Sequence, residues 1–160
     1  MKTNKIFRNA FFASILLSGA LFISSCEKDD DGDMNDDTYA VAGDASGAQE
    51  NPAVTTSGTA TLSGTYNSSS NKLDYTINWT GLSGAATAIH FHAPASVGVN
   101  AGAITDLTIS TNGINGQSKG TVTLTEEQES YLLNGQVYYN IHTLLYADGE
   151  VRGQVVTSDN

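Results

Sequence analysis

The residues of this chain best suited to metal chemistry are its three histidines, because imidazole nitrogen binds copper and zinc well. Two form the triplet His90-Phe91-His92, and the third, His142, ends the run Val137-Tyr-Tyr-Asn-Ile-His142. Residues two apart in a β-strand point to the same side, about 7 Å apart, so His90 and His92 share one face. If the strand that carries His142 lies beside theirs, the three imidazoles form one site on the outer surface of a sheet. The sequence thus predicts a copper or zinc site, the alternative being histidines that only hydrogen-bond to their neighbours.

Three further polar residues are expected near the histidines. Asn140 alternates with His142 on the same face of its strand, and Glu150 and Arg152 follow the turn signal Asp148-Gly149 with side chains predicted to face outward. Two interpretations remain open. Either these residues support the histidines, with Arg152 guiding an anion towards them, or Glu150 and Arg152 form a cross-strand ion pair that fixes the register.

Groups that support covalent catalysis are missing from the sequence. It contains no glycine-rich phosphate loop and no G-x-S-x-G motif, and its single cysteine, Cys26, is expected to carry a lipid. We therefore expect a binding or accessory module without catalytic activity. A redox-active copper protein is the alternative.

Apolar and polar residues alternate along much of the chain, which predicts β-strands. The segments 59–66 and 73–79 alternate in this way and are separated by Asn67-Ser-Ser-Ser-Asn71, so we expect a hairpin. Further strands are expected at 87–92, 104–109, 119–124, 137–143 and 150–156.

One segment, from Thr125 to Gly135, breaks the two-residue period. Thr125 and Gln128 have the spacing of a capping box, and Gly135 suits a helix end. The chain has 16 glycines and 2 prolines, a composition that suits short strands joined by tight turns. These features predict an all-β domain, an antiparallel β-sandwich or partly open barrel of about seven to eight strands with one short helix.

Residues 1–25 have the features of a signal peptide. Lys2, Lys5 and Arg8 precede an apolar stretch over 10–23 that is shorter than the roughly 20 residues of a membrane span. Ile23-Ser-Ser-Cys26 resembles the lipobox of bacterial lipoproteins, which implies that Cys26 is lipidated and that the peptide before it is removed. The alternative is an ordinary signal peptide followed by a chance cysteine.

Residues 26–38 form a second segment, the lipidated cysteine and an acidic tether. Seven acids occur in the eleven residues 27–37, so the segment cannot form a core and is expected to be extended. It is either a spacer or, through Lys28-Asp-Asp30, a signal that directs a lipoprotein to the outer surface. We expect an outer-membrane lipoprotein of the cell envelope, displayed on its surface or in the periplasm, with its folded domain over 39–160.

The net charge limits the partners of the mature protein. The formal charge of −10 becomes −13 once Lys2, Lys5 and Arg8 are removed. Nucleic acid is therefore excluded as a partner, because phosphate binding needs clustered cations. The expected membrane contact is the lipid anchor, and the sequence does not indicate which protein or small ligand is bound.

Four motifs, in order along the chain, resemble the CHRD domain, which is named for its repeats in chordin. They are Gly47-Ala-Gln-Glu-Asn-Pro-Ala-Val54, Ala88-Ile-His-Phe-His92, Gly135-Gln-Val-Tyr-Tyr-Asn-Ile-His-Thr143 and Gly149-Glu-Val-Arg-Gly-Gln154. The resemblance covers about 39–156 and implies a secreted domain with no established enzymatic activity. It assigns no binding residue.

The order of His90, His92, His142 and Arg152 is also similar to that in copper-zinc superoxide dismutase, a β-sandwich with an H-x-H strand and an anion-guiding arginine. The bridging histidine, the zinc ligands and the loop disulfide of that enzyme have no counterparts here. This likeness favours a copper-type site and not that enzyme.

Overall fold

A computed structural model describes residues 37–159, which lie within the compact unit Met34–Asn160. The predicted signal peptide, Cys26 and nearly all of the acidic tether lie outside the described residues. Within 37–159 the strands form one continuous sheet and their side chains form one hydrophobic core, so the fragment 34–160 contains the whole described domain.

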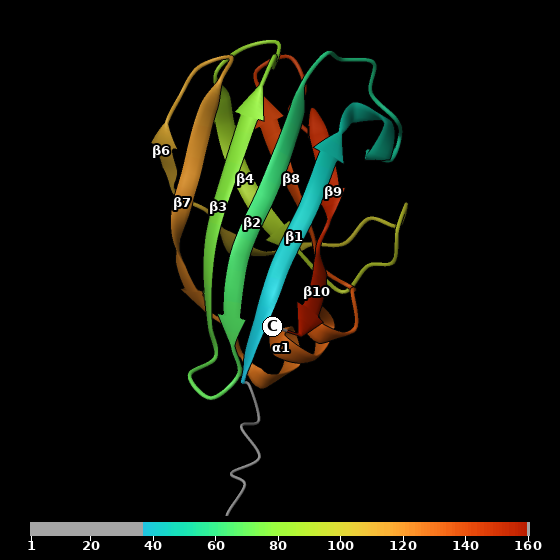
Figure 1. Cartoon of the computed structure of the whole chain (residues 1–160). Coiled ribbons are helices and arrows are strands. Elements are labelled where there is room, and N and C mark those ends of the chain that lie inside the picture. The colour runs from blue at the N-terminus through green and yellow to red at the C-terminus, as the bar shows by residue number, and fades with distance from the viewer. Residues whose placement is uncertain (1–36, 160) are drawn as a thin grey trace, which may run out of the picture. The chain divides into compact units, whose positions relative to one another are not determined.

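The described chain is all-β with one short α-helix and one 3-10 turn, as the sequence predicts (Figure 1). The helices are η1 (Gly47–Gln49) and α1 (Glu126–Leu133). The strands are β1 (Thr38–Ser46), β2 (Thr59–Asn67), β3 (Lys72–Thr80), β4 (Ala86–His92), β5 (Ala103–Asp106), β6 (Ile109–Thr111), β7 (Gly116–Thr123), β8 (Tyr138–Thr143), β9 (Val151–Gln154) and β10 (Val156–Asp159).

The strand number exceeds the prediction because two expected strands are each divided and one was not expected. The segment 104–109 contributes to both β5 and β6, and 150–156 contributes to β9 and β10 on either side of the buried Val155. The unexpected strand is β1, whose alanines and glycine have low β-propensity. It nevertheless lies inside the sheet because it pairs with β2 over its whole length.

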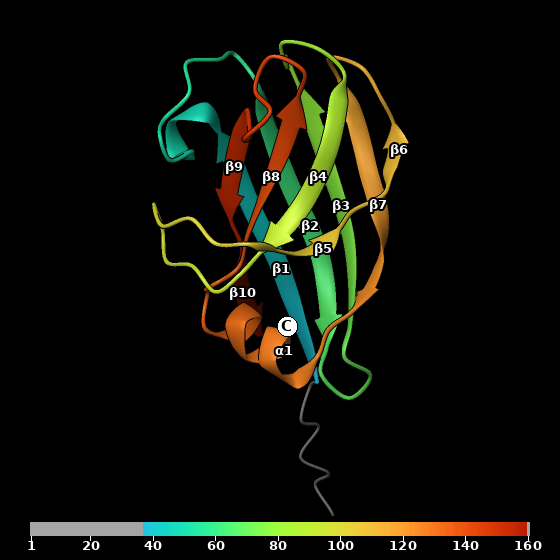
Figure 2. The same cartoon turned by 180° about the vertical axis from the view of Figure 1, so that it is seen from behind.

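All ten strands belong to one antiparallel sheet with the order β5-β4-β8-β9-β1-β2-β3-β7-β6, and β10 also pairs with β1. The sheet curls so that β4 and β8 lie behind β1, β2 and β3 (Figures 1 and 2). Its two ends approach each other, since the Asn112 side chain hydrogen-bonds to both main-chain groups of Ala86 at the start of β4. The fold is therefore a partly open barrel, or half-barrel.

Side chains with a two-residue period fill the space inside the curled sheet. Leu73, Tyr75, Ile77 and Trp79 of β3 are at most 3% exposed, and they face the buried residues of β4 and β8. Residues at the other positions of β3 are mostly solvent-exposed. Burial of one face is what fixes the register of each strand.

The helix α1 begins and ends as its sequence predicts. The Thr125 hydroxyl accepts a hydrogen bond from the Gln128 main-chain N–H, and the Gln128 side chain accepts one from Thr125 in return. Gly135, at φ +65°, follows the helix in the left-handed conformation that favours glycine. Among the described residues, no helix has the length and apolar character needed to cross a membrane.

Three neighbouring strands, β4, β8 and β9, have an inner face in the core and an opposite face that carries the histidines, which we call the histidine face. Its members are His90, His92, Tyr138, Asn140, His142 and Arg152. The loop 93–102, between β4 and β5, extends towards η1 (Figure 2). It is hydrogen-bonded to the η1 region through Asn51 and to β9 through Arg152, so it covers part of the histidine face.

Candidate metal centre

The pairing of β4 with β8 brings the three histidines together. His90 lies opposite Asn140, His92 opposite Tyr138, and His142 opposite Ala88. Residues directly opposite each other in an antiparallel pair point to the same side. Alternation within each strand and register between the strands therefore place all three imidazoles on the histidine face. Two of them belong to β4 and the third belongs to β8.

The nitrogens of the cluster converge closely enough to share one ion. His90 Nδ1 and His142 Nε2 are 3.0 Å apart, and one nitrogen from each histidine lies within 4.8 Å of the other two. Three atoms no more than 4.8 Å apart all lie within about 2.8 Å of a common point (4.8/√3), whereas metal–nitrogen bonds are about 2.0–2.1 Å long. Side-chain shifts of less than about 1 Å would therefore form the bonds.

Hydrogen bonds to the remaining nitrogens orient two of the rings. His92 Nδ1 donates to the Ala101 carbonyl at 2.9 Å, and His142 Nδ1 donates to the Ala147 carbonyl at 2.8 Å. A neutral imidazole has a single N–H, so donation from Nδ1 leaves Nε2 with its lone pair; in His92 this Nε2 atom lies 2.9 Å from Asn140 Oδ1. Most metal-bound histidines in proteins are held in this way.

The third ring, His90, has a carboxylate partner. His90 Nε2 is 3.4 Å from Asp106 Oδ1, which leaves Nδ1 to face His142. Its side chain is 22% exposed, while that of Asp106 is 92% exposed. The cluster is thus reached by solvent from the His90 side.

The ring of His92 is stacked on Tyr138 and hydrogen-bonded to the loop 93–102 through Ala101. The His92 and Tyr138 rings are parallel to within 2°, with centroids 4.6 Å apart, and the Arg152 guanidinium carbon lies 3.6 Å from the Tyr138 ring centre. The three side chains form a continuous stack. With Tyr138 on one face and Ala101 at Nδ1, the His92 ring has little freedom to turn.

Burial affects the protonation of two of the histidines. Desolvation lowers the pKa of His92, and desolvation also lowers the pKa of His142. Both imidazoles are therefore neutral at pH 7, which is the form that binds metal ions.

The expectation that the three histidines lie at the outer surface needs correction. His92 is only 9% exposed and is classed with the buried polar residues, while His90 and His142 are half-buried. Alternation correctly gives the face of the sheet on which they lie. It says nothing about the loop 93–102, which covers His92.

Glu150 and Arg152, which were predicted to face outward, are both buried, although Arg152 lies on the histidine face that alternation gives. Glu150 is 0% and Arg152 1% exposed, and within residues 37–159 they form no ion pair with each other. Arg152 instead donates to Asn100 Oδ1 at 3.0 Å and to the Val99 carbonyl at 2.8 Å. The loop provides acceptors in place of water, which makes burial of the guanidinium tolerable.

The Glu150 carboxylate has its own set of donors. It accepts hydrogen bonds from the Thr56 hydroxyl (2.6 Å), the Ser83 N–H (2.8 Å) and hydroxyl (2.6 Å), and the Thr143 hydroxyl (2.7 Å). Burial by itself would raise the pKa of Glu150, but these bonds outweigh it and the pKa is lowered. Glu150 therefore links two loops to the end of β8, one residue after His142.

Glu50 belongs to the site although no role was predicted for it. With His92, Asn140 and Asp148 it lines a hollow of about 320 Å³ beside the cluster. Burial raises the pKa of Glu50 to about 7, against the opposing effects of Arg152 and Asn140. No sequence signal joins residues 50 and 140; only the assembled fold does.

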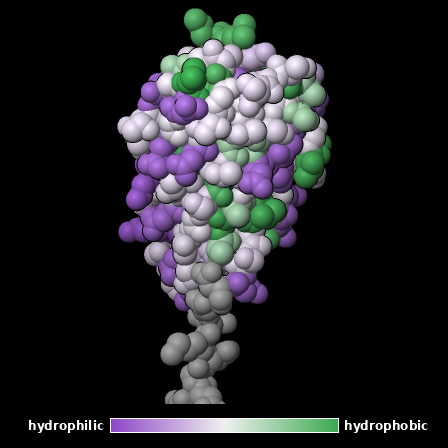
Figure 3. Space-filling model, turned by 45° about the horizontal axis from the view of Figure 1, so that its top comes forward, coloured by the Kyte–Doolittle hydropathy of each residue, from purple (hydrophilic) through white to green (hydrophobic). Residues whose placement is uncertain are grey.

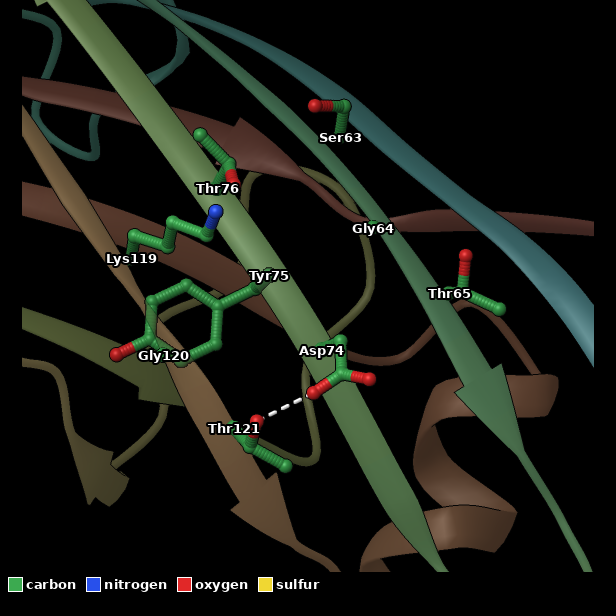
Figure 4. A pocket seen from close by; sticks show the side chains of 9 residues that line it. All are labelled: Ser63, Gly64, Thr65, Asp74, Tyr75, Thr76, Lys119, Gly120 and Thr121. Carbon is green, nitrogen blue, oxygen red and sulfur yellow. Dashed lines mark hydrogen bonds between the residues drawn. The ribbon is translucent and has the colours of Figure 1, made fainter.

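Another hollow, of about 390 Å³, lies on the exposed face of β2, β3 and β7 (Figure 4). It is lined by small hydroxyl side chains together with Asp74, Lys119 and Gly120, and Asp74 accepts a hydrogen bond from Thr121. This hollow contains no histidine. The histidine face is therefore the better candidate for a functional site.

Comparison with known protein families identifies the chain. The model of the CHRD domain matches residues 42–155, which include the histidine face and the four motifs. The chain belongs to the CHRD domain family. Membership of this family suggests a binding or accessory module. No curated protein and no solved structure matches the chain.

Proposed function

We propose that this CHRD domain is a metal-binding module that holds copper at His90, His92 and His142. The observation that carries the proposal is the convergence of three nitrogens within 4.8 Å of one another, two of them on rings oriented by main-chain carbonyls.

The separation of the two closest nitrogens favours ligands to one ion. Two nitrogens bound at about 2.0–2.1 Å with an angle near 90° are about 2.8–3.0 Å apart, and His90 Nδ1 and His142 Nε2 are 3.0 Å apart. Angles near 90° are typical of tetragonal copper(II), whereas zinc prefers tetrahedral angles. Copper is therefore the first candidate and zinc the second.

A binding or accessory role at the cell envelope fits the rest of the chain. The lipobox-like Ile23-Ser-Ser-Cys26 supports lipid anchorage, because the two or more acyl chains of a lipoprotein hold it on a membrane durably. Apolar side chains on the surface seen in Figure 3 occur in small separate groups, which does not suggest a large docking interface on that face.

The metal proposal is tested by titrating the fragment 34–160 with Cu²⁺ and with Zn²⁺ against a competing chelator. We expect a dissociation constant for copper in the nanomolar range, about −12 kcal/mol, and a loss of at least tenfold in His90→Gln and in His142→Gln. Thr61→Ala, an exposed change on the opposite layer, is the matched control. Binding no tighter than that of the unfolded fragment would refute the proposal.

Anchorage is tested separately in the full-length chain. Cys26→Ser is expected to move the protein from the membrane fraction to the soluble fraction, because no lipid can then be attached. Detergent extraction of both forms checks that aggregation is not the cause. Retention of the variant in membranes would show that the anchor is not at Cys26.

A further inference from the structure

The buried ring of His92 has an oxygen atom at each of its nitrogens. Nδ1 is 2.9 Å from the Ala101 carbonyl oxygen, and Nε2 is 2.9 Å from Asn140 Oδ1. A neutral imidazole has one N–H and one lone pair, so it can donate to only one of these two oxygens. At the other, two lone pairs face each other at hydrogen-bond distance.

The orientation of the Asn140 amide is set by acceptors on its other side. Asn140 Nδ2 is directed at the Asp148 carbonyl at 3.4 Å. The Glu50 carboxyl lies there as well, since a Cβ added at Gly149 would overlap Glu50 Oε1 and lie 2.7 Å from Asn140 Nδ2. Turning the amide over would bring Oδ1 against these two oxygens, so Oδ1 stays directed at His92. Asn140 is 3% exposed.

A cation between His92 and Asn140 would satisfy both lone pairs. Two donor atoms 2.9 Å apart are separated as neighbouring ligands of one metal ion should be, given bonds of about 2.0–2.2 Å. Asn140 also lies directly opposite His90, so its side chain is on the histidine face among the imidazoles. The facing lone pairs of His92 and Asn140 and the register of β4 with β8 thus indicate the same position for a metal ion, between Asn140 and the imidazoles.

We propose that Asn140 Oδ1 is the fourth protein ligand of the metal, completing a set of three imidazole nitrogens and one amide oxygen. This inference rests on the proposed function, and it adds a preference for oxidation state. A carbonyl-type oxygen is a hard ligand that suits divalent ions, whereas monovalent copper prefers softer donors. The site should therefore favour Cu²⁺ or Zn²⁺ over Cu⁺.

The test compares Asn140→Leu, which removes the oxygen at similar volume, with Asn140→Asp, which keeps an oxygen ligand. Cu²⁺, Zn²⁺ and, under reducing conditions, Cu⁺ are titrated into fragment 34–160, and the Cu²⁺ electron paramagnetic resonance spectrum is recorded. We expect Asn140→Leu to bind Cu²⁺ and Zn²⁺ about 10- to 100-fold more weakly, to bind Cu⁺ within threefold of the wild type, and to show an altered spectrum. Asn140→Asp should restore the divalent affinity.

Asn78→Leu, an exposed asparagine on β3, is the matched control and should change nothing. Wild-type Cu²⁺ affinity and an unchanged spectrum in Asn140→Leu would overturn the fourth ligand while leaving the three-histidine site intact. The fourth ligand would also be overturned if Asn140→Leu lost equal affinity for Cu⁺ and Cu²⁺ and Asn140→Asp restored neither. Asn140 would then only position His92. Failure of the wild type to bind any of the three ions would refute the proposed function itself.

Discussion

The Glu150→Gln substitution tests how the end of β8 is held in place. The change keeps the shape of the side chain but removes its charge and replaces one oxygen by an NH₂ group. All four partners of Glu150 are donors to the carboxylate, and one of them, the Ser83 main-chain N–H, cannot turn into an acceptor. The amide must therefore leave its oxygen there and direct its NH₂ group at the hydroxyls of Ser83 and Thr143.

The magnitude follows from the number of bonds. A hydrogen bond to a charged group contributes about 1.5–3 kcal/mol, and one between neutral groups about 1 kcal/mol. Four bonds that are each weakened by about 0.5–2 kcal/mol give a loss of roughly 2–8 kcal/mol, a large part of the 5–15 kcal/mol by which domains are usually stable. The hydroxyl partners can rotate to accept from the new NH₂ group, so we expect a loss in the lower half of this range.

The assay is urea unfolding of fragment 34–160, followed by tryptophan fluorescence of the buried Trp79. With a slope of about 1–3 kcal/mol per molar urea, the midpoint should fall by roughly 1–2 M. The pKa of Glu150 is lowered in the folded state, so its stabilisation is present above the ordinary value of 4.5 and is lost as the pH falls through the folded-state pKa. The difference between wild type and variant should shrink accordingly in acid.

Asp44→Asn, an exposed carboxylate on β1, serves as the control and should change the unfolding free energy by less than about 0.5 kcal/mol. If Glu150→Gln unfolds within the same margin of the wild type at pH 7, the buried carboxylate is not the link between the loops that its hydrogen bonds indicate.

Three further predictions concern the same end of the domain. Burial raises the pKa of Glu50 to about 7, so ionisation of this carboxyl weakens the fold as the pH rises. Glu50→Gln should therefore be about 2–3 kcal/mol more stable than the wild type at pH 8 and equal to it at pH 4. A difference in urea unfolding that stays constant across that pH range would contradict this. Arg152→Lys keeps the charge but loses the hydrogen bonds to the loop and the planar contact with Tyr138. Thermal unfolding should therefore show that the free energy of unfolding falls by about 2–3 kcal/mol. An unchanged melting temperature would exclude a role for the guanidinium. Gly149→Ala places a Cβ against Glu50 and Asn140 at φ +129°. The free energy of unfolding is expected to fall by at least about 1 kcal/mol in the same assay. Gly84→Ala is the control, because a Cβ there meets nothing within 4 Å.

Features that depend on neighbouring residues could be predicted from the sequence. The hairpin between β2 and β3 follows from two alternating segments and a turn of Asn and Ser, and the start of α1 follows from Thr125 and Gln128. The shared face of the three histidines also follows from alternation. These predictions need only the two-residue period and local hydrogen bonding.

Features that depend on distant segments could not be predicted in this way. Arg152 and Glu150 lie at polar positions of an alternating strand, and their burial results from loops far away in sequence. Glu50 and Asn140 share a hollow only after the η1 region has folded against β8 and β9. Exposure is a property of the assembled domain, whereas alternation specifies only a side.

The position of β1 has a consequence for how the domain folds. Tyr39, near its start, is paired with Asp159 of β10, so the first described strand pairs with a segment from the far end of the described domain. A sheet that closes through such distant pairing forms slowly. We expect a fragment that lacks residues 151–160 to stay unfolded, because β9 and β10, which both pair with β1, are then missing.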